Sequence, residues 1–255
     1  MDKSLGKAFL EKWTKYFNGA DLPFVFYCSD DDRYAECLRP VNAHVCMIGQ
    51  LAVVRKGQTL AFTEETFGCF GGRKYSGFPA ADWPDFKYFL SCGIPGELEG
   101  ERYKKTPELV EQYVKSTPVP PAEGKYIVFK RWDQIDENDD PQVVVFFAPP
   151  DVISGLFTLA NFASLEPQAV IAPFCSGCGS IISYPLAERK TENPRAVIGM
   201  FDVSARPFVK ENSLSFAAPM DKFTRMVGDM DESFLVTESW KKVLRRLERE
   251  EEEDS

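Results

Sequence analysis

The chain alternates between amphipathic segments with a helical period and short apolar runs typical of buried strands. Leu5, Phe9, Trp13 and Phe17 recur every four positions, so residues 4–17 are predicted to form a helix. Further helices are predicted over residues 43–56, 84–92, 106–117, 151–163, 181–186, 219–227 and 238–250. Strands are predicted over residues 23–28, 59–63, 125–132, 142–148, 168–172, 196–201 and 213–217, with 125–132 and 142–148 joined as a hairpin.

Two stretches of the chain repeat the order strand, helix, strand. The first uses residues 23–28, 43–56 and 59–63, and the second uses residues 142–148, 151–163 and 168–172. Such a unit normally forms two parallel strands with a right-handed crossover. We therefore expect an α/β fold, or a mixed α+β fold, of two pseudo-equivalent βαβ halves with flanking N- and C-terminal helices. The alternative is coincidence, because helices and strands alternate in many chains.

The halves are expected to form one compact unit rather than separate folding units. The predicted single domain covers residues 1–255 and contains one half at about 20–117 and another at about 125–230. Residues 231–255 are predicted to be a C-terminal helix and an acidic tail. The length is sufficient to bury a substantial core.

Each half ends in a cysteine loop. Cys69-Phe70-Gly71-Gly72 follows the strand at 59–63, and Cys175-Ser176-Gly177-Cys178 follows the strand at 168–172. Ligands of open α/β sheets bind beyond the carboxyl ends of parallel strands. We expect the two loops to face each other, with Cys69 matching Cys175 and Gly72 matching Cys178.

The second loop is a C-x-x-C sequence, whose spacing suits one metal ion, one cluster iron or a redox disulfide. A helix beginning after it would favour thiolate at these cysteines through its N-terminal dipole. The alternative is that both are structural thiols in a tight turn. Cys69, Cys175 and Cys178 are the predicted ligands of a metal or iron–sulfur cofactor.

Residues around the first loop could hold an anionic group. Arg73 and Lys74 follow the glycines directly, and the amides of Gly71, Gly72 and Gly177 are expected to point toward the predicted site. We predict that these five residues bind a carboxylate or phosphate.

The other cysteines and the single histidine carry weaker signals. Cys92 precedes a predicted helix end and is expected to be structural, with a fourth metal ligand as the alternative, and Cys46 is expected to be a core residue. His44 is the only histidine, which argues against a catalytic triad and against a histidine-rich metal site.

Composition limits the compartment and the partners. Net charge is −9 and no basic patch is present, so nucleic acid is not an expected partner. The acidic runs at 30–32, 136–140 and 248–254 are expected to be solvated. No apolar run is long enough to span a membrane, no signal sequence is evident, and seven cysteines indicate reduced thiols. We expect a cytoplasmic protein, with a small anionic molecule or a redox partner.

Three functions remain open. The first is a metal or iron–sulfur site, with iron–sulfur or zinc as the candidate cofactors, in a cleft between the halves, with one coordination position open for substrate or water. The second is a metal-free thiol–disulfide or cysteine-nucleophile enzyme, in which Cys175 attacks and Cys178 resolves. The third is a non-enzymatic module that binds a small anionic ligand or a tetrapyrrole.

The sequence resembles a known family. The stretch from Gly68 to Phe78, the downstream Cys175-Ser176-Gly177-Cys178 and the later Ser213-Leu214-Ser215-Phe216 are similar to the uncharacterised ArCR family, over residues of about 10–230. The resemblance implies a stand-alone soluble prokaryotic protein of a kind common in archaea and anaerobic bacteria. It implies no activity, cofactor or catalytic residue.

Overall fold

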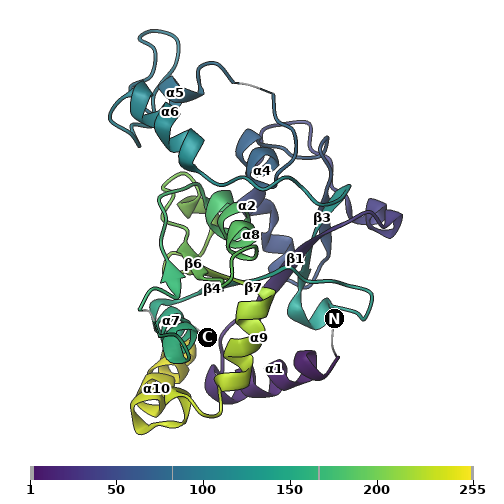
Figure 1. Cartoon of the computed structure of the whole chain (residues 1–255), viewed down its shortest axis with the longest axis vertical. Helices are drawn as coiled ribbons and strands as arrows, with labels where there is room; N and C mark the ends of the chain where they lie inside the picture. The colour runs from purple at the N-terminus through teal and green to yellow at the C-terminus, as the bar shows by residue number, and fades with distance from the viewer. Residues whose placement is uncertain (1–2, 82, 166, 254–255) are drawn as a thin grey trace.

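A mixed seven-stranded sheet is the central element of the fold. The computed structural model describes residues 3–81, 83–165 and 167–253. The strand order is β2-β3-β1-β4-β7-β6-β5, and helices lie at both ends of the chain, as predicted (Figure 1). The strands are β1 Phe24–Ser29, β2 Leu60–Phe62, β3 Tyr126–Arg131, β4 Val143–Ala148, β5 Val170–Ile171, β6 Ala196–Gly199 and β7 Leu214–Pro219. The sheet makes this a mixed α+β fold.

At the centre of the sheet, β1 of the first half of the chain and β4 of the second half pair antiparallel. On one side of this pair, β3, which was predicted to belong to the second half, lies between β1 and β2 and runs antiparallel to both, so β1 and β2 are parallel to each other. In the second half, β7 and β6 lie between β4 and β5, which are likewise parallel. The predicted hairpin of β3 with β4 is wrong, because β1 separates them.

The helices flank the sheet on both sides. They are α1 Lys3–Tyr16, α2 Met47–Gln50, α3 Ala52–Arg55, α4 Phe70–Tyr75, α5 Phe86–Phe89, α6 Pro107–Ser116, α7 Pro150–Phe162, the π-helical segment η3 Gly179–Ser183, α8 Tyr184–Glu188, α9 Met220–Asp229 and α10 Glu238–Glu253. The predicted helix over 43–56 is two short helices, α2 and α3. Its start was misplaced because Cys46, whose backbone is extended, precedes α2 as the cap.

Two hydrophobic layers cover opposite faces of the sheet. Successive strand residues point to opposite faces, so Val25 and Tyr27 join one layer while Phe24 and Phe26 join the other. The first layer includes α1, α7, α9 and α10, and the second includes α2, α3, α4 and the helix from η3 to α8 (Figure 1). Burial on both faces explains why these strands read as continuous apolar runs. Both cysteine loops belong to the second layer.

One part of the acidic run at 136–140 is buried, contrary to the expectation that it is solvated. Asp139 is 1% exposed. Its carboxylate accepts hydrogen bonds from Tyr27 Oη at 2.5 Å, Tyr34 Oη at 2.7 Å and Lys130 Nζ at 2.7 Å. Because a buried charge needs partners, this carboxylate is a structural centre that ties β1, β3 and the β3–β4 connection together.

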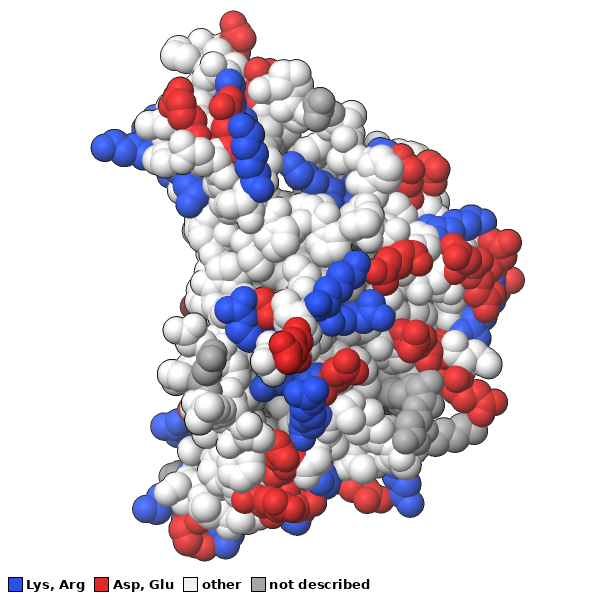
Figure 2. All heavy atoms as spheres, viewed as in Figure 1, with Lys and Arg blue, Asp and Glu red and all other residues white. Residues whose placement is uncertain are grey.

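The surface has no single sign of charge on the face in view. Figure 2 shows Lys and Arg interspersed with Asp and Glu over that face. Among the described helices, none is both long enough and apolar enough to cross a membrane.

Candidate functional site

The second cysteine loop opens a helix. Ser176 is its cap, since its Oγ accepts a hydrogen bond from the Gly179 N–H at 3.0 Å. The helix runs from 177 through η3 to the end of α8, so Cys178 lies in its first turn and Cys175 precedes the cap. π-Helical turns such as η3 are rare in proteins, and many of those that occur lie at functional sites.

The first cysteine loop also opens a helix, and here the cysteine itself is the cap. Cys69 Sγ accepts a hydrogen bond from the Gly72 N–H at 3.3 Å. Cys69 therefore has the role that Ser176 has in the second loop, and Gly72 has the role of Gly179. When the two loops are aligned by their capping atoms, Cys69 corresponds to Ser176, one residue after the predicted match with Cys175.

The structure brings Cys69 close to Cys178, since α4 packs against η3. Burial raises the pKa of Cys178 well above its ordinary value, and the neighbouring Cys69 and Cys46 raise this pKa further. Cys178 is 6% exposed. Three thiols from three separate helix starts thus lie within electrostatic range of one another.

Cys46 is the member of this group that sequence reasoning assigned to the core. It caps α2, and burial raises its pKa while the amides of Gly49 and Ile48 offset part of that rise. No spacing pattern links Cys46 to the other cysteines, because the link is purely tertiary. The thiol cluster is defined here as Cys46, Cys69 and Cys178.

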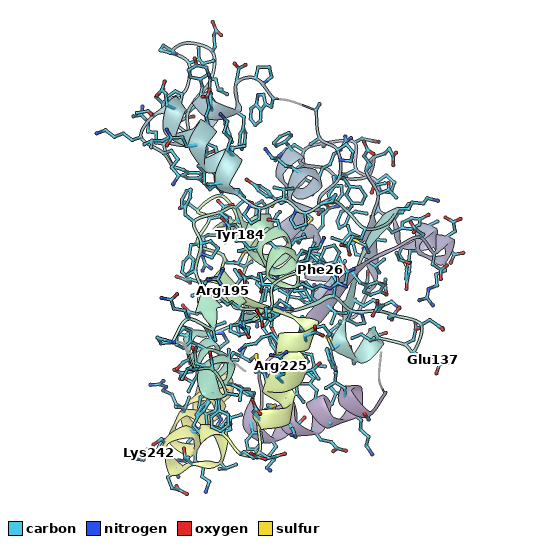
Figure 3. The ribbon with its side chains drawn as sticks, viewed as in Figure 1. Phe26, Glu137, Tyr184, Arg195, Arg225 and Lys242 are labelled. Carbon is cyan, nitrogen blue, oxygen red and sulfur yellow. The ribbon has the colours of Figure 1, made fainter. Side chains whose placement is uncertain are left out.

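Cys175 lies in different surroundings from Cys178. Burial and the charge of Asp202 raise its pKa to about 12, and its sulfur contacts the Pro173 carbonyl oxygen at 3.5 Å. Ionisation of Cys175 would raise the pKa of three nearby tyrosine hydroxyls, those of Tyr75, Tyr113 and Tyr184. Figure 3 labels Tyr184 at the start of α8, on the side nearer α6. Cys175 is therefore part of a tyrosine-lined region beside the thiol cluster.

Several predicted anion ligands have partners inside the protein. Arg73 forms an ion pair with Glu64 at 2.5 Å and donates to the Pro79 carbonyl. The Gly177 N–H donates to Asp202 Oδ2 at 2.9 Å. Gly72 packs closely, since a Cβ there would lie 3.1 Å from Met47 Cβ. Binding of an anion by these residues, by Gly71 and by Lys74 stays a prediction.

Asp202 is a site residue that the sequence did not reveal. Besides Gly177, it accepts hydrogen bonds from the Ser204 N–H at 3.1 Å and from Ser204 Oγ at 2.8 Å. Met200, the residue directly after β6, has a left-handed φ of 66° although it is not glycine. Such strain in a buried residue next to a cysteine loop is typical of a functional region.

The thiols are not arranged as a ready-made metal cage. Across residues 3–81, 83–165 and 167–253, no three His, Cys, Asp or Glu side chains surround a point that could hold one metal ion. All seven cysteines are free thiols. Ligation of one ion by Cys69, Cys175 and Cys178 together therefore gains no support from the geometry.

The chain was compared with known proteins at the level of families, curated sequences and solved structures. The searches of curated proteins and of solved structures found no match. A family model described as uncharacterised ArCR matches residues 20–229, which include the thiol cluster, Cys175 and Asp202. The chain therefore belongs to the uncharacterised ArCR family.

Proposed function

We propose that this protein binds a soft, thiophilic metal ion through the two thiolates of Cys69 and Cys178. The observation that carries the proposal is the packing of α4 against η3, which brings Cys69 of one half of the chain near Cys178 of the other half. Thiolates and thioethers select soft ions such as Cu(I).

The surroundings of the thiol cluster support a soft ion. A Cβ at Gly72 would lie 3.1 Å from both Cys69 Sγ and Met47 Cβ, so a methionine adjoins the cluster. The methyl group of Met200 lies beside Gly177, at 3.1 Å from a Cβ built there. Sulfur from cysteine and methionine in an apolar environment is the donor set that Cu(I) prefers.

The number of available protein ligands favours a soft ion such as Cu(I) over zinc or an iron–sulfur cluster. Structural zinc and iron–sulfur clusters are usually held by four protein ligands. Cu(I) is stable with only two thiolates, so it needs no third side chain around the same point. The iron–sulfur and zinc hypotheses remain predictions that the same experiment tests.

The metal-free nucleophile hypothesis receives less support. Burial raises the pKa of Cys175 to about 12 and raises that of Cys178 as well. Both groups are then protonated near neutral pH, whereas the thiolate is the attacking species in disulfide exchange. The helix dipole, which was expected to favour thiolate, is outweighed by burial.

Anaerobic titration of the reduced protein tests the proposal. Cu(I), Zn(II) and iron with sulfide are added separately, and the bound metal is counted against a competing chelator. We expect one Cu(I) per chain and the release of protons on binding, because cysteine ligates a metal as the thiolate.

Four variants locate the site. Cys69→Ala and Cys178→Ala should each lose tight Cu(I) binding, and Cys175→Ala should retain it. Cys92→Ala is the matched control, since Cys92 is exposed. Binding of zinc or of a cluster that depends on Cys175 would contradict the proposal and favour the three-cysteine site predicted from the sequence.

A further inference from the structure

Trp83 borders two hollows in the part of the chain between α4 and β3. The larger one, called the cavity here, has a volume of about 650 Å³ and is walled by α4, the segment after it, the start of α5, and Val114 and Val119. The smaller one, of about 270 Å³, is walled by Trp83, Phe86 and one side of α6. The size of the cavity is within the range of roughly 300–1,000 Å³ found for small-molecule sites. In Figure 1 this region lies between α4 and the pair α5 and α6, at the upper end of the molecule.

Contacts within the chain hold the walls of the cavity in place. The segment before β3 is fixed to the end of α4, because the Ala122 N–H donates to the Gly77 carbonyl oxygen at 3.0 Å. On the other side, α5 packs against α6, and the Lys87 ammonium forms an ion pair with the Glu111 carboxylate at 2.7 Å. The cavity is therefore formed before any ligand enters, as small-molecule sites usually are.

Aromatic rings line the cavity. Phe70 of α4, Phe86 of α5 and Trp83 just before α5 are mutual neighbours, with ring centroids 5.5–5.9 Å apart and planes tilted between 49° and 76°. Trp83 is 37% exposed and is the most exposed of the described aromatic residues in the wall, whereas the other three tryptophans of the chain are each 3% exposed or less. Aromatic rings attract one another in offset-stacked or edge-to-face arrangements, so an exposed indole among tilted rings offers a surface on which a further ring can pack.

The charge in the wall argues for an uncharged ligand. Among the described residues of the wall, the charged side chain is that of Lys74. Its Nζ lies 5.5 Å from the ring centroid of Phe70 and 5.2 Å from that of Phe86, and Lys74 has a further interaction inside the protein. The ammonium is thus already engaged, and its positive charge disfavours a cation in the cavity. Because burial of a charge without a partner is costly, the wall favours a ligand that carries none.

We infer that the cavity binds a small, uncharged, planar aromatic molecule whose ring system packs against Trp83. The planar aromatic body follows from the exposed indole and the tilted rings beside it. The absence of net charge follows from the engaged ammonium, and Val114 and Val119 supply apolar surface for the rest of the ligand. The inference is independent of metal binding at the thiol cluster, and the two sites share only α4.

Three matched probes, titrated calorimetrically into the full-length protein, test the ligand class. 2-Naphthol is planar and uncharged near neutral pH, 2-decalol has the same skeleton and hydroxyl group with saturated rings, and 2-naphthoate carries a carboxylate. We expect 2-naphthol to bind at one site per chain, roughly tenfold more tightly than 2-decalol, because the saturated rings make no aromatic contacts. 2-Naphthoate should bind at least about tenfold more weakly than 2-naphthol, because its carboxylate would leave water without a partner.

Fluorine NMR of protein labelled with 5-fluorotryptophan locates the bound probe. The chain has four tryptophans, so four resonances are expected, and the one missing in Trp83→Leu belongs to Trp83. We expect 2-naphthol to shift the Trp83 resonance. The resonances of Trp13, Trp132 and Trp240 should stay in place, because these side chains are buried in the hydrophobic layer on the other face of the sheet.

Variants assign the affinity to the cavity. Trp83→Leu keeps an apolar side chain and should weaken 2-naphthol binding about tenfold without changing 2-decalol binding. Ala80→Trp fills the cavity and should abolish binding of both probes, and Val114→Phe serves the same purpose should Ala80→Trp not fold. Phe157→Leu is the matched control, because Phe157 is an aromatic residue 42% exposed on α7, and it should leave both affinities unchanged.

Contrary results would overturn the inference in distinct ways. Equal affinity for 2-naphthol and 2-decalol would remove the aromatic body from the ligand class, and tighter binding of 2-naphthoate would replace the uncharged ligand by an anion. An unchanged Trp83 resonance, or unchanged binding in folded variants with a filled cavity, would place the probe elsewhere. Dimerisation that Trp83→Leu abolishes, in a protein that binds none of the probes, would make this surface an interface between copies of the chain.

Discussion

Removal of the buried carboxylate of Asp139 should destabilise the protein strongly. In Asp139→Asn, the Lys130 ammonium would keep its position with only 8% of its side chain exposed, but it would lose the counter-ion at 2.7 Å. Tyr27 and Tyr34 would also lose a charged acceptor. Breaking one partner of a buried ion pair typically costs about 3–5 kcal/mol. For a chain of this size, that loss lowers Tm by roughly 10 °C or more.

Equilibrium unfolding in urea, followed by circular dichroism, measures the cost. Asp140→Asn is the matched control, since the neighbouring Asp140 is exposed and should change stability by less than about 0.5 kcal/mol. The double variant Asp139→Asn with Lys130→Met removes both charges and should recover part of the loss. A cost below about 1 kcal/mol for Asp139→Asn, or a double variant that loses the sum of both single changes, would refute the reasoning.

Three further predictions follow from the same structure. Burial alone would raise the pKa of Asp139, but hydrogen bonds from Lys130 and Tyr27 lower this pKa overall. The carboxylate therefore stabilises the fold above its unfolded pKa of about 3.9, and this stabilisation is lost as the pH falls below that value. Unfolding midpoints measured between pH 2 and 6 should accordingly depend less on pH in Asp139→Asn than in the unmodified protein. Gly77→Ala should lower the free energy of unfolding by about 3 kcal/mol or more, because Gly77 has a φ of 84° and a Cβ there would lie 2.2 Å from the Pro120 carbonyl oxygen. Gly96 has a φ of 78°, but a Cβ there would have no atom within 4 Å. Gly96→Ala should therefore lower the free energy of unfolding by only about 1–2 kcal/mol in the same denaturation assay. Iodoacetamide at neutral pH should modify the exposed Cys92 first and the buried Cys178 last, as judged by peptide mass spectrometry, and early labelling of Cys178 would contradict its burial and raised pKa.

The sequence predicted the kinds of elements well, because periodicity reports which face of a segment is buried. All seven predicted strands are present, and Thr106 caps α6 by accepting a hydrogen bond from the Leu109 N–H at 3.3 Å, as its sequence signal indicates. Periodicity does not report which strands pair. The insertion of β1 between β3 and β4 depends on contacts distant in sequence, and no local signal distinguishes it from a hairpin.

The candidate site was likewise predicted only in part, because local sequence signals do not report tertiary contacts. The two cysteine loops were recognisable from spacing and glycine content, and the structure brings Cys69 near Cys178. Cys46 and Asp202 join them only through tertiary packing. The capping roles of Cys69 and Ser176 depend on single hydrogen bonds, which a comparison of loop sequences does not resolve. Asp139 looked like a member of a solvated acidic run because its partners lie more than 100 residues away or across a turn.

The pairing of β1 with β4 has a consequence for how the protein holds together. These strands join the halves of the sheet, yet their register extends only over Phe24–Phe26 of β1, half the length of the ladder that β1 forms with β3. The two sides of the sheet are therefore joined at its centre by a short ladder between β1 and β4, called the seam here. Cys69 and Cys178 belong to opposite sides of that seam, so any ion that bridged them would act as a clasp across it. Its binding free energy would then add directly to the resistance of the two halves to separation.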